Sequence, residues 1–436
     1  MLNKLKRILP FFISFPAYLA IYTSLLFISP CASKGSILQG FIWSFNVVNS
    51  FFGVPLLAGI FTDSIGVINM LPIYDLLLIV GQIIVYFSFN SGRNEPMALV
   101  GLFFTCFSYG LKDTSRLVYV ANTFITKRDN EYDIREFSTQ NVIILASRYA
   151  ILALVAFFSF EEICSTNIAT LTLICLGFSV IGLLASIGLN IINKIEVQEQ
   201  RKYKMENGLN SVDEGNIFVE YNNRMDQNED ETPTLTHVFR KLFKEANMGY
   251  VKFWLFGAAC LMTLSTLYIT KRLYVTVPYL FPSLQLILTL ALIWVLTEKR
   301  MRFLTMFSAL FFIVFQIYSF FQTDFVEWVM VVALPVALLF TDIYMPFAFD
   351  FDLSYLGITI GVKKCFENFL LLFASITHSM MSEDAYKFYQ LGLAVAGFCL
   401  VLLYNESYLK HKSLASVSER VPLLNSSDSK LEVVRS

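Results

Sequence analysis

Charged side chains inside long apolar runs are the residues of this sequence whose types and spacing could do chemistry. Lys112, Asp113 and Arg116 lie near the middle of one such run, and Arg148 lies near the middle of the next. Lys112 and Arg116 are four residues apart and share a helix face, while Asp113 can pair with Arg116 three residues later. A charge at the centre of a bilayer costs on the order of 3 kcal/mol or more, so these residues are expected to serve a function.

A cavity that contains charges of both signs suits a zwitterion. A guanidinium offers a carboxylate two parallel donors, so Arg148 or Arg116 is expected to hold that group in preference to Lys112. The ammonium end needs a carboxylate, which Asp113 or Glu367 can supply. The alternatives are structural, because Arg148 can pair with Asp113, and Glu367 can pair with a lysine one turn earlier.

Motifs for metal, nucleophile or phosphate chemistry are not found in the sequence. The three histidines are scattered, and the seven cysteines form no CxxC pair. We therefore predict neither an enzyme nor a bound cofactor. The net charge of −1 removes any argument for nucleic-acid binding.

The apolar runs themselves indicate membrane spans. Apolar residues make up 56% of the chain and charged residues 15%, and the mean hydropathy is +0.59. Soluble domains carry about a quarter charged residues, and a helix needs about twenty residues to cross the bilayer. The predicted spans are 8–29, 37–61, 69–90, 97–124, 138–160, 167–192, 250–270, 278–297, 303–321, 327–347, 357–380 and 388–404.

The longest polar stretch divides the chain into two halves. We predict an all-α membrane protein with twelve transmembrane helices in two six-helix bundles, 1–192 and 249–404, followed by a cytosolic tail, 405–436. The linker 193–248 is acidic, but apolar residues recur at helical spacing near its end. That pattern favours an amphipathic helix on the membrane surface, and the alternative is the start of span seven. Lysine and arginine collect on the side of both termini, which indicates that both are cytosolic.

A short glycine and aspartate pattern follows the second span. It reads Gly59-Ile-Phe-Thr-Asp63-Ser-Ile-Gly66. Gly59 allows close helix approach, Gly66 allows a tight turn, and Asp63 can sit against positive helix N-termini. The pattern resembles the GxxxDxxG signature of the major facilitator superfamily, and the resemblance implies the major facilitator fold. Substrate is then expected between the halves, near the midplane.

Further residues resemble one branch of that superfamily, which contains the lysosomal dipeptide transporter. The resemblance rests on Asn46-Val-Val, Phe51-Phe-Gly, Val80-Gly-Gln, Ala121-Asn-Thr and Arg148. It implies a dipeptide or similar zwitterion as substrate, with Asn46 as a further candidate in the cavity lining. Ser115 stands where the resemblance would place a substrate-binding acid, with Asp113 close by.

The tail carries a sorting pattern. Glu419, Leu423 and Leu424 form an acidic dileucine sequence of the ExxxLL kind, which sorting adaptors of endosomes and lysosomes read. The two N-x-S/T matches, at Asn405 and Asn425, fall in the same cytosolic tail and cannot be glycosylated there. A glycosylated accessory subunit is therefore a conjectured partner that could protect the protein among lysosomal proteases.

The leading interpretation is a secondary transporter of dipeptides or similar zwitterions in an endolysosomal membrane. One alternative is a carrier of another small solute, a sugar or an organic anion. A different class is a membrane receptor or scaffold that keeps the fold and does not transport. Coupling is left open, because facilitated diffusion and proton coupling are equally compatible with the sequence.

Overall fold

The computed structural model describes most of the first half of the chain and parts of the second. The described residues are 2–23, 49, 54–90, 92, 94–124, 126–128, 131–133, 135–157, 168–207, 280–292, 310, 313–314, 316–317, 356–382 and 384–403.

Helices lie where five of the six apolar runs of the first half predict them, and a short helix lies at the end of the remaining run. α4, α5 and α6 begin within three residues of the predicted starts. The helices of this half are α1 (Leu2–Thr23), α3 (Val54–Phe61), α4 (Val67–Asn90), α5 (Glu95–Phe124), α6 (Arg135–Phe157) and α8 (Ile168–Asn207).

Four helical segments of the described residues are long and apolar enough to cross a membrane. They are Leu5–Thr23, Val54–Asn90, Ile168–Glu199 and Asp384–Leu403. α5 and α6 have the length to span as well, with 30 and 23 residues, since about twenty suffice. Their charged residues, among them Lys112, Asp113, Arg116 and Arg148, lower their hydropathy.

Small residues let α4 and α5 approach closely. A Cβ atom on Gly81 of α4 would lie 2.8 Å from the carbonyl oxygen of Gly101 on α5. Beside this contact the Gln82 amide donates to the Thr105 hydroxyl at 3.0 Å. Small and polar side chains commonly hold helices together in a bilayer, where lipid is as apolar as leucine.

The glycine and aspartate pattern forms a π-helical turn, η3 (Thr62–Gly66), between α3 and α4. Gly66 has a φ of 94°, which glycine adopts without the steric penalty of other residues. A second connection, between α5 and α6, contains a hairpin that the sequence analysis does not predict. Its antiparallel strands are β1 (Thr126–Arg128) and β2 (Glu131–Asp133).

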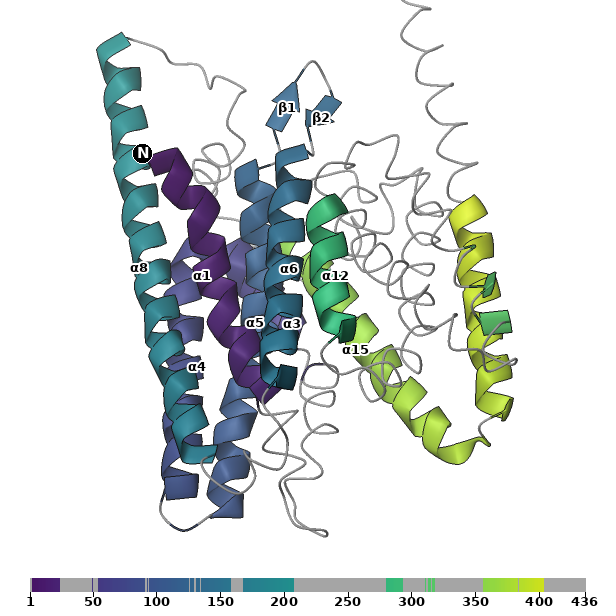
Figure 1. The fold of residues 1–436 in the computed structure, drawn as a ribbon. Helices are drawn as coiled ribbons and strands as arrows, with labels where there is room; N and C mark the ends of the chain where they lie inside the picture. Colours follow the sequence, from purple (N-terminus) through teal and green to yellow (C-terminus); the bar gives the residue numbers. More distant parts are fainter. Residues whose placement is uncertain are drawn as a thin grey trace, which may run out of the picture.

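In the second half the described helices are α12 (Leu280–Leu292), α15 (Leu356–Met380) and the helix Asp384–Leu403. α12 packs on α6, and α15 packs on α3 and α5. Figure 1 shows α15 leaving the first half as it proceeds, and the helix Asp384–Leu403 then turns back in the opposite direction. Among the described residues the two halves of the chain thus meet at the start of α15 and along α12.

Glycines make this contact possible. A Cβ on Gly361 of α15 would lie 2.5 Å from the Pro55 carbonyl oxygen of α3. Gly59 and Gly357 face each other in the same way, backbone against backbone. We call these glycines and the α3 residues that they touch the α3–α15 seam.

α8 continues fifteen residues beyond the predicted end of its span, to Asn207. The beginning of the predicted linker is therefore helical. Glu196 on this extension forms an ion pair with Lys6 of α1, which gives the polar part of the helix a tertiary contact. The predicted amphipathic helix later in the linker lies outside the described residues.

Candidate functional site

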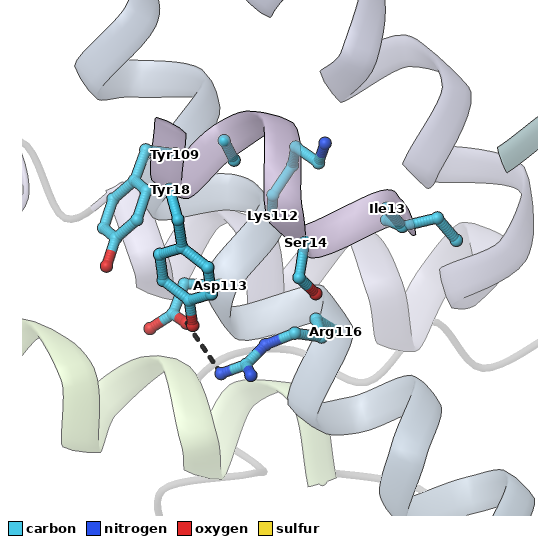
Figure 2. A pocket seen from close by; sticks show the side chains of 8 residues that line it. Ile13, Ser14, Tyr18, Tyr109, Lys112, Asp113 and Arg116 are labelled. Carbon is cyan, nitrogen blue, oxygen red and sulfur yellow. Dashed lines mark hydrogen bonds and ion pairs between the residues drawn. The ribbon is translucent and has the colours of Figure 1, made fainter. Parts of the chain in front are cut away.

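A small cavity of about 10 Å³ lies between α1 and α5. α1 contributes small and aromatic side chains, and α5 contributes the charged triplet predicted from the sequence. Figure 2 shows Tyr18, Asp113 and Arg116 pointing toward one another on one side of it. The lining residues are Ile13, Ser14, Ala17, Tyr18, Tyr109, Lys112, Asp113 and Arg116.

Asp113 is the centre of a charged cluster. Its Oδ1 accepts a hydrogen bond from Arg116 Nη2 at 2.8 Å, the i,i+3 pair that the spacing predicts. The Tyr18 hydroxyl lies 3.4 Å from the same oxygen. Oδ2 lies 3.3 Å from Nζ of Lys364, which belongs to α15 in the second half of the chain. One carboxylate thus connects α1, α5 and α15. We call Asp113, Arg116, Lys364 and Arg148 the charged cluster.

Two arginines lie over neighbouring tyrosines of α1. The Arg116 guanidinium carbon is 5.8 Å from the ring centroid of Tyr18, and that of Arg148 is 5.7 Å from the centroid of Tyr22. The two rings stack at 6.3 Å because four residues separate them on one helix face. The Nε of Arg148 is buried and has no hydrogen-bond partner among the described residues. Two guanidiniums, one from α5 and one from α6, therefore lie over tyrosines that are about one helical turn apart on α1.

Lys112 has a different environment from Arg116, although the two share a helix. Its ammonium forms an ion pair with Asp75 of α4, and the Ser186 hydroxyl of α8 donates to the other oxygen of that carboxylate. The side chain of Lys112 is 3% exposed and that of Asp75 is not exposed at all. This contact supports a packing role for Asp75, and it gives Lys112 a fixed partner inside the first half.

The signature turn holds the start of α15. The carboxylate of Asp63 accepts hydrogen bonds from the backbone N–H groups of Gly357 at 2.9 Å and Ile358 at 2.7 Å. The first N–H groups of a helix have no partner within it and carry partial positive charge, so a carboxylate is stabilising there. The structure thus places Asp63 against a helix N-terminus, on the half of the protein opposite its own.

The structure does not describe the remaining candidate residues or their side chains. Asn46 and the tail residues Glu419, Leu423 and Leu424 lie outside the described residues. Glu367 belongs to α15, but its side chain is not among those described.

Sequence reasoning did not assign Lys364 to Asp113, because the two lie in different halves and no local spacing connects them. Lys112 and Asp75 are 37 residues apart, on different helices. One feature of the sequence could have suggested this ion pair. Both residues interrupt apolar runs, where a charge without a partner is costly.

No family model matches the chain, and no curated protein matches it. Several solved structures, however, match it in fold. The proton:xylose symporter XylE, bound to 6-bromo-6-deoxy-D-glucose, superposes with a TM-score of 0.60 at 12% identity, over 94% of each chain. The human organic anion transporter MFSD10 (TETRAN) gives 0.57 at 12% identity, covering 92% of this chain and 98% of that one. FucP in the outward conformation gives 0.56 at 12% identity, over 91% and 97%.

These likenesses extend over nearly the whole length of each chain, and they show the fold. The chain is an all-α membrane protein with the major facilitator fold, as the sequence predicts. The short β1–β2 hairpin is a local addition to this fold.

Proposed function

We propose that this chain is a secondary transporter that moves dipeptides or similar small zwitterions across an endolysosomal membrane by alternating access. The observation that carries the proposal is the charged cluster around Asp113. It places both signs of charge beside a cavity, at a point where the first half meets α15. Transporters with this fold bind substrate between their halves.

The cluster offers complementary groups to the two ends of a peptide. Arg148 has a buried donor that is not used by any described residue, and a guanidinium binds a carboxylate through two parallel hydrogen bonds. Asp113 can receive an ammonium group, because substrate can replace Lys364 at its Oδ2. Tyr18 and Tyr22 add aromatic surface along α1.

A second candidate is a carrier of organic anions. It is favoured by the several cations near the cavity, and one protein of similar fold is an organic anion transporter. The proposed endolysosomal localisation rests on the dileucine pattern of the tail and on the resemblance to the dipeptide transporter branch.

The test is uptake of a mixed radiolabelled dipeptide pool into proteoliposomes by the purified full-length chain, compared with Arg148→Ala. We expect saturable uptake that falls at least about tenfold in the variant, since a lost charged hydrogen bond is worth roughly 1.5–3 kcal/mol. The matched control is Arg7→Ala. Arg7 is 58% exposed and pairs with Glu136 away from the cavity, so its uptake should equal that of the wild type.

Two results would contradict the proposal. If folded wild-type protein takes up no dipeptide, with or without a pH gradient, dipeptides are excluded and another solute or a non-transporting role remains. If Arg148→Ala takes up every zwitterion at the wild-type rate, Arg148 is not the carboxylate anchor.

A further inference from the structure

Lys112 lies on the same helix as the α5 residues of the charged cluster but points elsewhere. It directly precedes Asp113 in the chain and lies about one helical turn before Arg116. Its side chain contributes to the cavity lining, but Figure 2 shows it extending away from Tyr18, Asp113 and Arg116. Its ammonium pairs with Asp75 of α4. Lys112 is therefore placed to hold α5 against its neighbours.

The contact of Lys112 with Asp75 connects three helices of the first half. One oxygen of the Asp75 carboxylate accepts from Lys112, and the other accepts from the Ser186 hydroxyl of α8. α8 can approach because residue 182 is glycine. A Cβ there would lie 3.2 Å from Asp75 Oδ1 and 3.0 Å from Cγ of Pro16 on α1. These helices belong to one half, so the contact does not depend on how the two halves dock.

Geometry, more than stability, is what such an ion pair supplies. Replacing a buried ion pair by apolar side chains of similar volume is often neutral or stabilising, so α4 and α5 could pack without it. Two fixed charges, however, set the rotation of α5 about its own axis. Successive residues of a helix are about 100° apart. The rotation that directs Lys112 at Asp75 therefore also fixes the direction of Asp113.

We infer that Lys112, together with Asp75 and Ser186, positions Asp113 to receive the substrate ammonium. This inference rests on the proposed function, in which Asp113 binds that group, and it gives Lys112 no contact with substrate. A hydrogen bond between charged groups is worth about tenfold or more in affinity. A displacement of about 1 Å is enough to lose most of such a gain.

The experiment compares alanyl-alanine with N-acetyl-alanyl-alanine, which share the carboxylate and differ in the ammonium. The KM for uptake of each is measured in proteoliposomes that contain the full-length protein. Wild type should prefer alanyl-alanine by about tenfold or more. The double variant Lys112→Met with Asp75→Asn should melt near the wild-type temperature, and its preference should fall to about threefold or less.

A matched control removes a different polar contact between the same two helices. The Gln82 amide of α4 donates to the Thr105 hydroxyl of α5 at 3.0 Å, and each residue lies two helical turns from Asp75 or Lys112 on its own helix. Gln82→Leu with Thr105→Val should therefore keep the wild-type preference. If the first double variant does not fold, Ser186→Ala gives the same test, because it keeps both charges and releases Asp75 from α8.

The outcomes separate this inference from the proposed function. An unchanged preference in the folded double variant would show that the ion pair serves packing alone, and would leave dipeptide transport standing. An equal rise in KM for both peptides would mean that Lys112 contacts the carboxylate they share, which also overturns the inference. Uptake of neither peptide by folded wild-type protein would overturn the proposed function and this inference together.

Discussion

Replacing Asp63 by asparagine tests whether the signature turn holds α15 against the first half of the protein. The carboxylate accepts from two backbone N–H groups, those of Gly357 and Ile358, and the residue is 5% exposed. Asparagine has the same shape but only one oxygen. Its NH₂ group would face the second N–H, which leaves a buried donor without an acceptor.

The magnitude follows from those two contacts. Losing one hydrogen bond to a charged group costs about 1.5–3 kcal/mol, and losing the negative charge at a helix N-terminus costs about 0.3–1 kcal/mol more. The sum, roughly 2–4 kcal/mol, corresponds to a factor of about thirty to a thousand in a conformational equilibrium. The variant should therefore favour conformations in which the start of α15 leaves α3.

Cys365 reports this separation. It lies on α15, one turn beyond Gly361, and its thiol lies against the backbone of Leu56 in the α3–α15 seam. We expect Asp63→Asn to raise the rate of maleimide alkylation at Cys365 by at least about tenfold, measured by peptide mass spectrometry so that the other cysteines do not interfere. Ser64→Ala is the matched control, because Ser64 is exposed and its hydroxyl donates to the Ile60 carbonyl oxygen, four residues earlier in the chain.

An unchanged alkylation rate at Cys365 in folded Asp63→Asn would refute this reasoning. It would mean that the glycine contacts hold the seam without help from the carboxylate. A rate that rises equally in Ser64→Ala would instead point to general loosening of the turn.

Three other perturbations have defined outcomes. Lys112→Ala leaves Asp75 buried without its partner, so the free energy of unfolding should fall by about 3–5 kcal/mol; the double variant Lys112→Met with Asp75→Asn should recover most of it in a thermal melt. Any Cβ at Gly361 would lie 2.5 Å from a carbonyl oxygen of α3, so Gly361→Ala should already reduce uptake, and Gly361→Val, which adds two methyl groups at the same contact, should reduce it further in the same assay. Leu423→Ala with Leu424→Ala should move a fluorescently tagged chain from endolysosomes to the cell surface in live-cell imaging, and an unchanged distribution would remove the sorting proposal.

The helices of the first half are predictable because hydropathy is a local property. The run predicted at 97–124 becomes α5, Glu95–Phe124, although three charges interrupt it. The extension of α8 to Asn207 is not predictable in the same way. Its polar composition resembles a linker, and a contact that stabilises it, between Glu196 and Lys6, joins opposite ends of the first half.

In the candidate site, too, contacts within one helix are predictable from the sequence and contacts between helices are not. The Arg116–Asp113 pair follows from a spacing of three residues on one helix, so sequence alone predicts it. The contact of Asp113 with Lys364 depends on how the two halves dock, and docking leaves no periodic signal in a sequence. The same holds for Lys112, whose partner is on α4. The sequence therefore identifies the charged residues and the partner on the same helix, but not the partners on other helices.

Two cations of the described residues that contact Asp113 differ in a way that matters for a moving protein. Arg116 lies on the same helix, so its contact with Asp113 survives any rigid movement of the halves. Lys364 lies on α15, so its contact breaks when α15 separates from α5. An ion that loses its only partner inside a membrane is costly, but Asp113 always retains Arg116. The lysine can therefore leave, or be replaced by a substrate ammonium, at a smaller cost than breaking an isolated buried pair.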